Sequence, residues 1–278
     1  MAVTKCTSWQ LKNPIVFGLL FIAALLLPAS GAVLSSDEII QKIQNRAISL
    51  TQSTNGASYE FFKKTTVKQL DGTLAKTGDT KVSLSKVTQQ FGVSKSQLIS
   101  VNGVPSEPSK GTSEDLSKKR TEGRTISEGT RNKNPWLNNK LIQKFVFQVV
   151  GEENVAGRKC WVMEFNPKKV DLPKEEMVDR FLKQLRGKIV VDQEEFEVAR
   201  FELNLVEKVR IWGGLIGSLD NLTVTVHRGR QDDGVWIDAS SATQITGRKL
   251  ITSTSIRIME ETFDIKKAPS KPSDNSKT

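Results

Sequence analysis

The sequence predicts an α+β fold in which one curved antiparallel sheet is served by two or three helices. Most segments after residue 56 alternate between apolar and polar residues, which is the period of a β-strand. Only two segments, near residues 36–52 and 171–187, repeat apolar residues at helical spacing. The Asp-Gly pairs at 71–72 and 233–234 are typical of tight hairpin turns, so neighbouring strands are expected to run antiparallel.

The beginning of the chain has the features of a secretory signal peptide. Lys5 and Lys12 precede an apolar run over residues 14–28, and small residues follow before the first acidic residues. A charged start, an apolar middle and a small-residue cleavage site predict a signal peptide over residues 1–32 and export to the bacterial periplasm. A retained membrane anchor is the alternative, but the run is short for a full membrane span.

The net charge is +10, from 41 basic and 31 acidic residues. Export argues against a nucleic-acid partner. A basic surface on an exported protein is expected to be attracted to an anionic membrane surface. The alternative is a charged surface that serves only solubility.

Catalytic machinery is not expected. Cleavage of the signal peptide would remove Cys6 and leave Cys160 as a single cysteine, so no internal disulfide is expected. Cys–His catalysis would need a base near Cys160, and the one histidine, His227, lies in an alternating stretch, so Cys160 is interpreted as a small packed residue. The chain contains no HExxH, no GxSxG and no His/Cys cluster, so we expect no enzyme, no metal and no cofactor.

The first expected helix begins after Ser35 or Ser36, either of which can cap it, and ends before Asn55-Gly56. Acidic residues in its first turn favour a helix start. The residues at helical spacing form one apolar stripe: Ile39, Ile40, Ile43, Ala47 and Leu50. A helix with such a stripe is expected to pack on the sheet.

The strands are expected in hairpins. Tyr59 and Phe61 share one face of the first strand, which leads to the turn at Asp71-Gly72. The second hairpin joins residues 144–151 to 157–169 through a longer loop, GEENVAG. The further expected strands are residues 187–212, in two pieces, 222–245, folded across Asp233-Gly234, and 247–265.

Three segments interrupt or follow the strands. Residues 171–188 predict a second helix, starting near Pro173 and ending at Gly187. Residues 103–139 are polar and rich in Gly, Pro and Ser, so they are expected to form a mobile basic insertion. Residues 267–278 are rich in Lys, Pro and Ser and are expected to be a disordered tail.

Residues 78–103 resemble the LysM glycan-binding module. Gly78-Asp79-Thr80 and the later FGVS…L…N segment are similar to the module's turn and the segment that follows its helix. The spacing is longer than the module's, and Lys81 stands where an apolar residue is usual. The segment is therefore kept as a candidate for a glycan-binding function.

The stretch FQVVGEENVAGRKCWVMEFNPKK resembles the strand pair of periplasmic lipoprotein carriers, the LolA/LolB-like superfamily that also includes RseB-like regulators. The matching features are Gly151, Val155, Gly157, Arg158 and the apolar strand that ends at Pro167. The opening helix and the later strands also agree, so the resemblance covers roughly residues 36–266. It implies that residues 33–266 form one domain, a curved half-open β-barrel with an N-terminal helix and a lid helix.

On such a fold, one face of the strands would look into the barrel and bind a ligand. Alternation places Trp161, Met163 and Phe165 on one face. The expected hydrophobic cavity is lined by these three together with Phe145, Phe147, Phe201 and Leu203, and by Met177 and Phe181 of the lid helix. Methionine and aromatic side chains suit packing against acyl chains.

Two functions follow as hypotheses. The first is a periplasmic binding or carrier protein for lipid or lipoprotein acyl chains, which works by reversible burial. The second is an envelope interaction or sensor module that binds a protein or cell-wall partner through the basic insertion or the LysM-like segment. A filled core without a ligand is the structural alternative for the aromatic face.

Overall fold

The computed structural model describes residues 34–52, 58–70, 77–90, 93–106, 138–168, 177–211, 217–249 and 252–268. The expected signal peptide lies outside these residues. So do most of the expected insertion, at 107–137, and all of the expected tail except its first two residues, which belong to the last strand. Among the helices described, none has the length and apolar character needed to span a bilayer.

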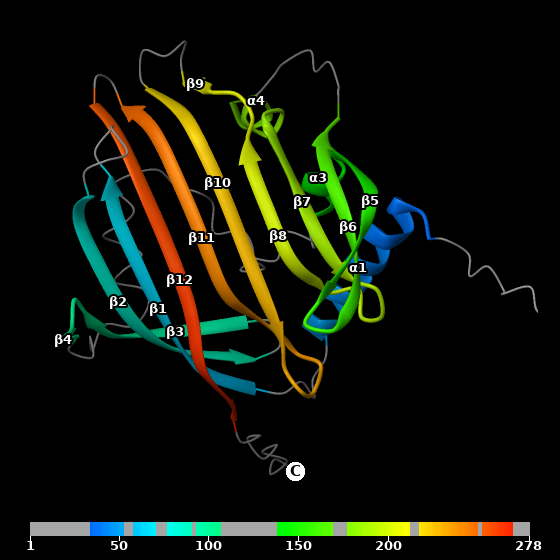
Figure 1. Ribbon diagram of the computed structural model, residues 1–278, viewed down its shortest axis with the longest axis horizontal. Coiled ribbons are helices and arrows are strands. Elements are labelled where there is room, and N and C mark those ends of the chain that lie inside the picture. Colours follow the sequence, from blue (N-terminus) through cyan, green and yellow to red (C-terminus); the bar gives the residue numbers. More distant parts are fainter. Residues whose placement is uncertain are drawn as a thin grey trace, which may run out of the picture. The chain divides into compact units, whose positions relative to one another are not determined.

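One antiparallel sheet forms the body of the structure (Figure 1). Its strands are β1 (Ser58–Leu70), β2 (Thr77–Gln90), β3 (Val93–Val101), β4 (Val104–Pro105), β5 (Phe145–Val155), β6 (Arg158–Pro167), β7 (Leu185–Asp192), β8 (Val198–Leu205), β9 (Val209–Ile211), β10 (Gly217–Arg230), β11 (Trp236–Lys249) and β12 (Thr252–Ala268). The order is β4-β3-β2-β1-β12-β11-β10-β8-β7-β6-β5, and β9 pairs with β10. The edge strands β4 and β5 do not pair with each other, so the sheet is open.

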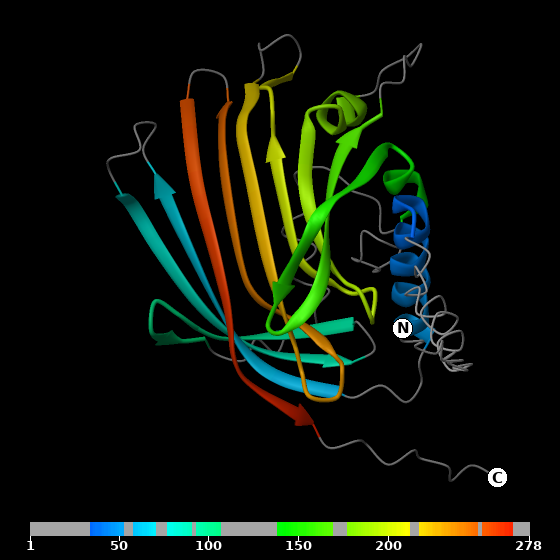
Figure 2. The same ribbon diagram turned by 45° about the vertical axis from the view of Figure 1, so that its right-hand side comes forward.

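The sheet bends along its long strands (Figure 2). Register shifts mark β-bulges in β12, between Phe263 and Lys266, in β5, between Val149 and Gly151, and in β10, between Leu219 and Asn221. Each bulge adds a residue to one strand only, which bends that strand and increases its twist. The predicted α+β class, with a curved half-open antiparallel sheet, is confirmed.

Three helices accompany the sheet. Helix α1 (Ser36–Gln52) packs beside β5, where the backbone N–H of Val149 donates to Ser36 Oγ at 3.1 Å. Its apolar stripe is buried at Ile39, Ile43 and Ala47, as the spacing predicts. The short helices are α3 (Asn139–Ile142) and α4 (Met177–Leu182), and α4 lies beside β9.

The structure corrects the boundary of the second predicted helix. Helix α4 ends at Leu182, and Gly187 lies inside β7 instead of ending a helix. Leu185 is buried at the start of β7, paired with Leu205 of β8. Pairing with two neighbouring strands satisfies the backbone groups of this segment, so strand pairing overrides its helical spacing.

The predicted long loop between residues 151 and 157 is also wrong. Strand β5 continues to Val155, and only Ala156 and Gly157 connect it to β6. Both residues have positive φ, at 49° and 82°. Two consecutive residues with positive φ form the two-residue turn whose twist matches that of a β-hairpin. The bulge after Val149 accommodates the one residue by which β5 is longer than the paired part of β6.

The LysM interpretation of residues 78–103 is wrong as well. Gly78, Asp79 and Thr80 lie within β2, and the following described residues form the antiparallel pair of β2 and β3. The described part of this segment contains no helix. The sequence analysis does not predict β2 and β3.

One row of residues across the sheet shows where the core lies. Directly opposed residues share a face. From β6 to β2 this row reads Met163, Ile189, Phe201, Val226, Ser241, Glu260, Thr65 and Ser83. This row is apolar from β6 to β10 and polar from β11 to β2, whereas towards the other end of the same strands Tyr59, Phe61, Val87 and Ile237 form a second buried apolar cluster.

The buried carboxylate of Asp192 holds the turn between β7 and β8. Arg158 donates to it from Nε at 2.5 Å and from Nη2 at 2.8 Å. The backbone N–H groups of Glu194 and Glu195 also donate to Oδ1 of Asp192, at 3.0 and 2.8 Å. Burial alone would raise the pKa of Asp192, but these hydrogen bonds outweigh it and lower the pKa below its ordinary value.

Two further acids of this turn reach distant segments. Glu195 accepts from Arg230 at 2.6 Å and from Trp236 Nε1 at 2.7 Å. The Arg230 hydrogen bonds are the main cause that lowers the pKa of Glu195. Glu197 pairs with Arg228 of β10 at 2.8 Å and with Arg46 of α1 at 3.2 Å. The turn therefore ties helix α1 and the β10–β11 hairpin to β7.

Replacing Asp192 by Asn should lower the free energy of unfolding by about 3 kcal/mol, because Arg158 loses its buried counter-charge. The measurement is urea denaturation at pH 7. The matched control is Asp238→Asn, which removes the exposed partner of Arg228 and should cost well under 1 kcal/mol. Equal losses in the two variants would contradict the central role of Asp192.

The same pair should make stability depend on acid pH. The folded pKa of Asp192 is lowered, so its contribution is complete above the pKa of about 3.9 of free aspartate and is lost as the pH falls through the folded value. Between pH 5 and pH 2, roughly the window set by that lowered pKa, the wild type should lose more stability than Asp192→Asn. Parallel pH profiles of the two proteins would show that the Asp192 carboxylate does not contribute.

Candidate functional site

Most of the predicted ligand-binding residues lie on one face of strands β5–β8, which we call the aromatic face. Phe147 lies opposite Phe165 across β5 and β6. Met163 lies opposite Ile189 of β7, which in turn lies opposite Phe201 of β8. The residues that the strand register and ring contacts bring together are Phe145, Phe147, Trp161, Met163, Phe165, Phe201 and Leu203.

Phe165 is the centre of the aromatic face. Its ring stacks on Phe201 with centroids 5.8 Å apart and planes 10° apart. Phe145 meets it edge-on at 5.5 Å, and Phe147 lies tilted at 5.9 Å. Offset stacks and edge-to-face contacts at these distances are favourable beyond the apolar area they bury.

Gly187 makes this stacking arrangement possible. It lies directly opposite Phe165, between that ring and Leu203 of the next strand. A Cβ atom at Gly187 would approach the carbonyl oxygen of Glu202 to 1.9 Å and Cζ of Phe165 to 2.5 Å. Because glycine has no side chain, the Phe165 ring can lie flat over β7 and reach Phe201 on β8.

Burial divides the aromatic face into a packed floor and a partly open surface. Met163, Phe165 and Phe145 are buried, with Met163 fully so. The half-buried residues are Phe147, Trp161, Phe201 and Leu203. The face therefore offers apolar side chains whose surface is still accessible on a sheet that is open at its edges.

Helix α1 covers the Trp161 end of the aromatic face. The Trp161 ring lies 5.7 Å from that of Phe196, which belongs to the β7–β8 turn. Nζ of Lys42 on α1 lies 4.8 Å from the centre of the Phe196 ring. Phe196 adopts a φ of +55°, which the hydrogen bonds of the Asp192 turn support. The sequence analysis missed Phe196, whose position depends on this turn.

The structure places the two predicted lid residues, Met177 and Phe181, on α4. Phe181 is a half-buried residue of α4. Met177 begins α4, and its side chain lies outside the described part. Gln184 accepts a hydrogen bond at its carbonyl from the backbone N–H of Val206 at 2.8 Å, which holds the end of α4 to the end of β8.

The described residues offer little chemistry. Within the described ranges, no three His, Cys, Asp or Glu side chains cluster in a way that could hold a metal ion. Cys160 is fully buried in a cluster with Val190, Ala199 and Trp236, and burial raises the pKa of its thiol. A protonated, enclosed thiol is a poor nucleophile. His227 is exposed on β10, between Arg200 and Ser240 of its neighbouring strands.

No protein-family model matches the sequence, and no curated protein matches it. The fold is similar to that of several solved structures. One is an outer membrane lipoprotein-sorting protein domain from Vibrio parahaemolyticus, with 14% identity, a TM-score of 0.38 and coverage of 85% of this chain and 96% of that chain. Another is a LolA superfamily protein from Nitrosomonas europaea, with 11% identity, a TM-score of 0.33 and coverage of 86% and 96%.

A third similar structure is the MucA/MucB complex of Pseudomonas aeruginosa, with 9% identity, a TM-score of 0.24 and coverage of 83% of this chain and 99% of that chain. One of these similar structures is a LolA superfamily protein, which is the group that the sequence resemblance names.

Replacing Gly187 by Ala should lower the free energy of unfolding by about 3 kcal/mol, because its Cβ would collide with the β8 backbone and the Phe165 ring. Chemical denaturation and near-ultraviolet circular dichroism would measure the loss of stability and of ring packing. Gly151→Ala is the matched control, since a Cβ at Gly151 meets nothing within 4 Å. If both variants behave like the wild type, Gly187 is not needed for the stack.

Proposed function

We propose that the protein binds acyl chains of a lipid or lipoprotein on the aromatic face, in the bacterial cell envelope. The half-buried surface of Phe147, Phe201 and Leu203 beside the packed floor of Met163 and Phe165 is the observation that carries the proposal. Apolar chains gain free energy there by removing this surface from water, at about 25 cal/mol per Å². Binding of this kind is reversible and requires no covalent step.

The row of residues from Met163 to Ser83 indicates where on the sheet an acyl chain would lie. Strands β5–β8 and β10 present apolar residues, whereas β11 and β12 present Ser241 and Glu260 on the same face. Glu260 is occupied by Lys63 and Ser241, at 3.4 and 3.2 Å. A hydrocarbon chain over these polar groups would cost free energy, so the acyl chain belongs on the β5–β10 half.

The expected signal peptide supports the envelope location, with Lys5 and Lys12 ahead of the apolar run. The proposal contains no catalytic step. Helix α4, which carries Phe181 and lies beside β9, is the element that would move aside when an acyl chain enters or leaves.

A second candidate is an envelope interaction module that recognises a protein. Strand β5 is an edge of the sheet, and Val146 and Val150 on it are 53% and 48% exposed. An edge strand with exposed apolar side chains can pair with an extended segment of another protein. The test is a substitution on β5. Replacing Val150 by Pro should abolish the binding of a partner that pairs with β5, while acyl-chain binding is retained.

Replacing Phe201 by Asp should weaken the binding of a fluorescent fatty acid at least tenfold, because a charged carboxylate on the apolar surface must keep water with it. Fluorescence titration measures affinity, and thermal unfolding is recorded alongside. Phe263→Asp is the matched control, since Phe263 is 46% exposed and stacks with Phe62, outside the aromatic face.

If Phe201→Asp unfolds the protein, Leu203→Ser tests the same surface with a neutral side chain. Purified wild-type protein that carries no lipid in native mass spectrometry and fails to bind the fatty acid at micromolar concentration would refute the acyl-chain proposal. Equal losses in Phe201→Asp and Phe263→Asp would show that the probe binds somewhere else.

A further inference from the structure

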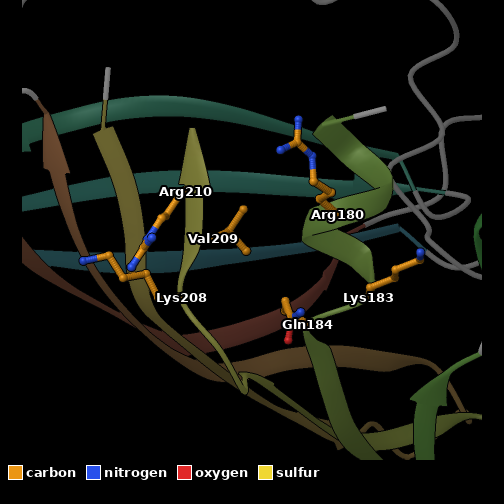
Figure 3. Close-up of a pocket in the computed structure, with 6 residues that line it drawn as sticks. All are labelled: Arg180, Lys183, Gln184, Lys208, Val209 and Arg210. Carbon is orange, nitrogen blue, oxygen red and sulfur yellow. The ribbon is translucent and has the colours of Figure 1, made fainter. Parts of the chain in front are cut away.

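A basic pocket lies between α4 and the segment that leads into β9 (Figure 3). Its volume is about 430 Å³, and the lining residues are Arg180, Lys183, Gln184, Lys208, Val209 and Arg210. None of the residues predicted to bind an acyl chain lines it. Four of its six lining side chains are cations and none is an acid, so the pocket attracts negative charge.

The cations are only partly neutralised. Lys208 pairs with Asp220 at 2.5 Å, and this hydrogen bond is the main cause that lowers the pKa of Asp220. Asp179, next to Arg180, pairs with Lys144 on another segment. Glu207 is exposed beside Lys208. Within the described part of the chain, Arg180 and Arg210 have no ion pair.

The cationic side chains spread around the rim. In Figure 3, Val209 and Gln184 lie between the two groups of cations, and the charged ends of Arg180 and Lys183 extend outward from α4. Side chains that enclose a single small anion converge on one point, as bidentate arginines do on a phosphate. Spread cations instead match many negative groups on an extended surface.

Two exposed apolar side chains lie close to these cations in the sequence. Val178 precedes Arg180 by two residues on α4 and is 59% exposed, and Val206 precedes Lys208 by two residues and is 47% exposed. Cations combined with exposed aliphatic groups suit the interface of a bilayer, where phosphates meet the cations and the acyl boundary takes up the valines. A purely polar partner would leave both valines in water.

We propose that the end of the sheet formed by α4 and β9 docks on an anionic phospholipid bilayer. Docking here brings α4, which carries Phe181, to the membrane from which an acyl chain would be taken or to which it would be delivered. The docking itself needs only the cations and the valines; its role in loading a chain rests on the proposed function.

The test is flotation of the protein with vesicles of phosphatidylcholine that contain one third phosphatidylglycerol, and with vesicles of phosphatidylcholine alone. The wild type should bind the anionic vesicles, and its binding should weaken as salt is raised because surface charges are screened. The double variant Arg180→Gln, Arg210→Gln should bind them about thirtyfold more weakly, from the loss of two cations near the lipid surface.

The matched control is Lys95→Gln, Arg257→Gln, which removes the same charge from exposed positions on β3 and β12. It should change vesicle binding by no more than about twofold, apart from long-range attraction. Val178→Asp should weaken binding as well, whereas Val146→Asp on β5 should not. Equal losses in the two charge-matched variants would overturn docking at this end and leave only a diffuse charge effect.

Two further results would also overturn the docking proposal. The first is equal binding to neutral and anionic vesicles. The second is binding of soluble short-chain phosphatidylglycerol as tight as that of vesicles, since this would indicate a site for one headgroup. The fatty-acid titration is run separately on the same variants. Loss of vesicle binding with retained fatty-acid binding supports docking, whereas retained vesicle binding without fatty-acid binding refutes only the acyl-chain function.

Discussion

The carboxylate of Asp192 is the constraint on which the described fold depends. It has no solvent exposure and carries a negative charge that Arg158 and two backbone N–H groups compensate. An unpaired buried charge costs several kcal/mol, so the turn can close only when Arg158, from the start of β6, has reached it. Glu195 and Glu197 on the same turn then hold β10, β11 and α1, which are remote in sequence.

This turn also positions the aromatic face. Phe196 follows Asp192 by four residues and places its ring against Trp161, with Lys42 of α1 over it. The electrostatic network and the apolar packing are therefore parts of one arrangement. Charged groups sit at the end of β7, and β7 itself carries Gly187, over which Phe165 stacks onto Phe201.

The apolar row extends over only part of the sheet. An open sheet can therefore offer apolar side chains to a ligand without exposing a long apolar patch. The apolar row ends where Val226 of β10 meets Ser241 of β11, and the hydrogen bonds of Glu260 begin on the next strand. Because this apolar row ends at β10, the accessible surface that would promote aggregation is limited. The cations and valines at α4 and β9 lie at an end of this sheet, where a membrane would supply both charge and apolar volume.

The sequence by itself determined the fold class, helix α1 and the pairing of the β10–β11 hairpin. These depend on local rules: the stripe from Ile39 to Ala47 has helical period, and Asp233-Gly234 can adopt a tight turn, with Gly234 at a φ of +85°. The alternation of Trp161, Met163 and Phe165 also predicts that these side chains share one face, as the strand register shows.

Only the tertiary structure decided which residues meet. Alternation identifies a face but not the strand beside it, so the row from Met163 to Ser83 could not be read from the chain. Gly187 was expected to end a helix because its neighbours have helical spacing, yet its role comes from an aromatic ring on another strand. Asp192, in a stretch of acids, has the sequence context of a surface turn. Its burial follows from Arg158, 34 residues away, because long-range charge pairing leaves no periodic signal in the sequence.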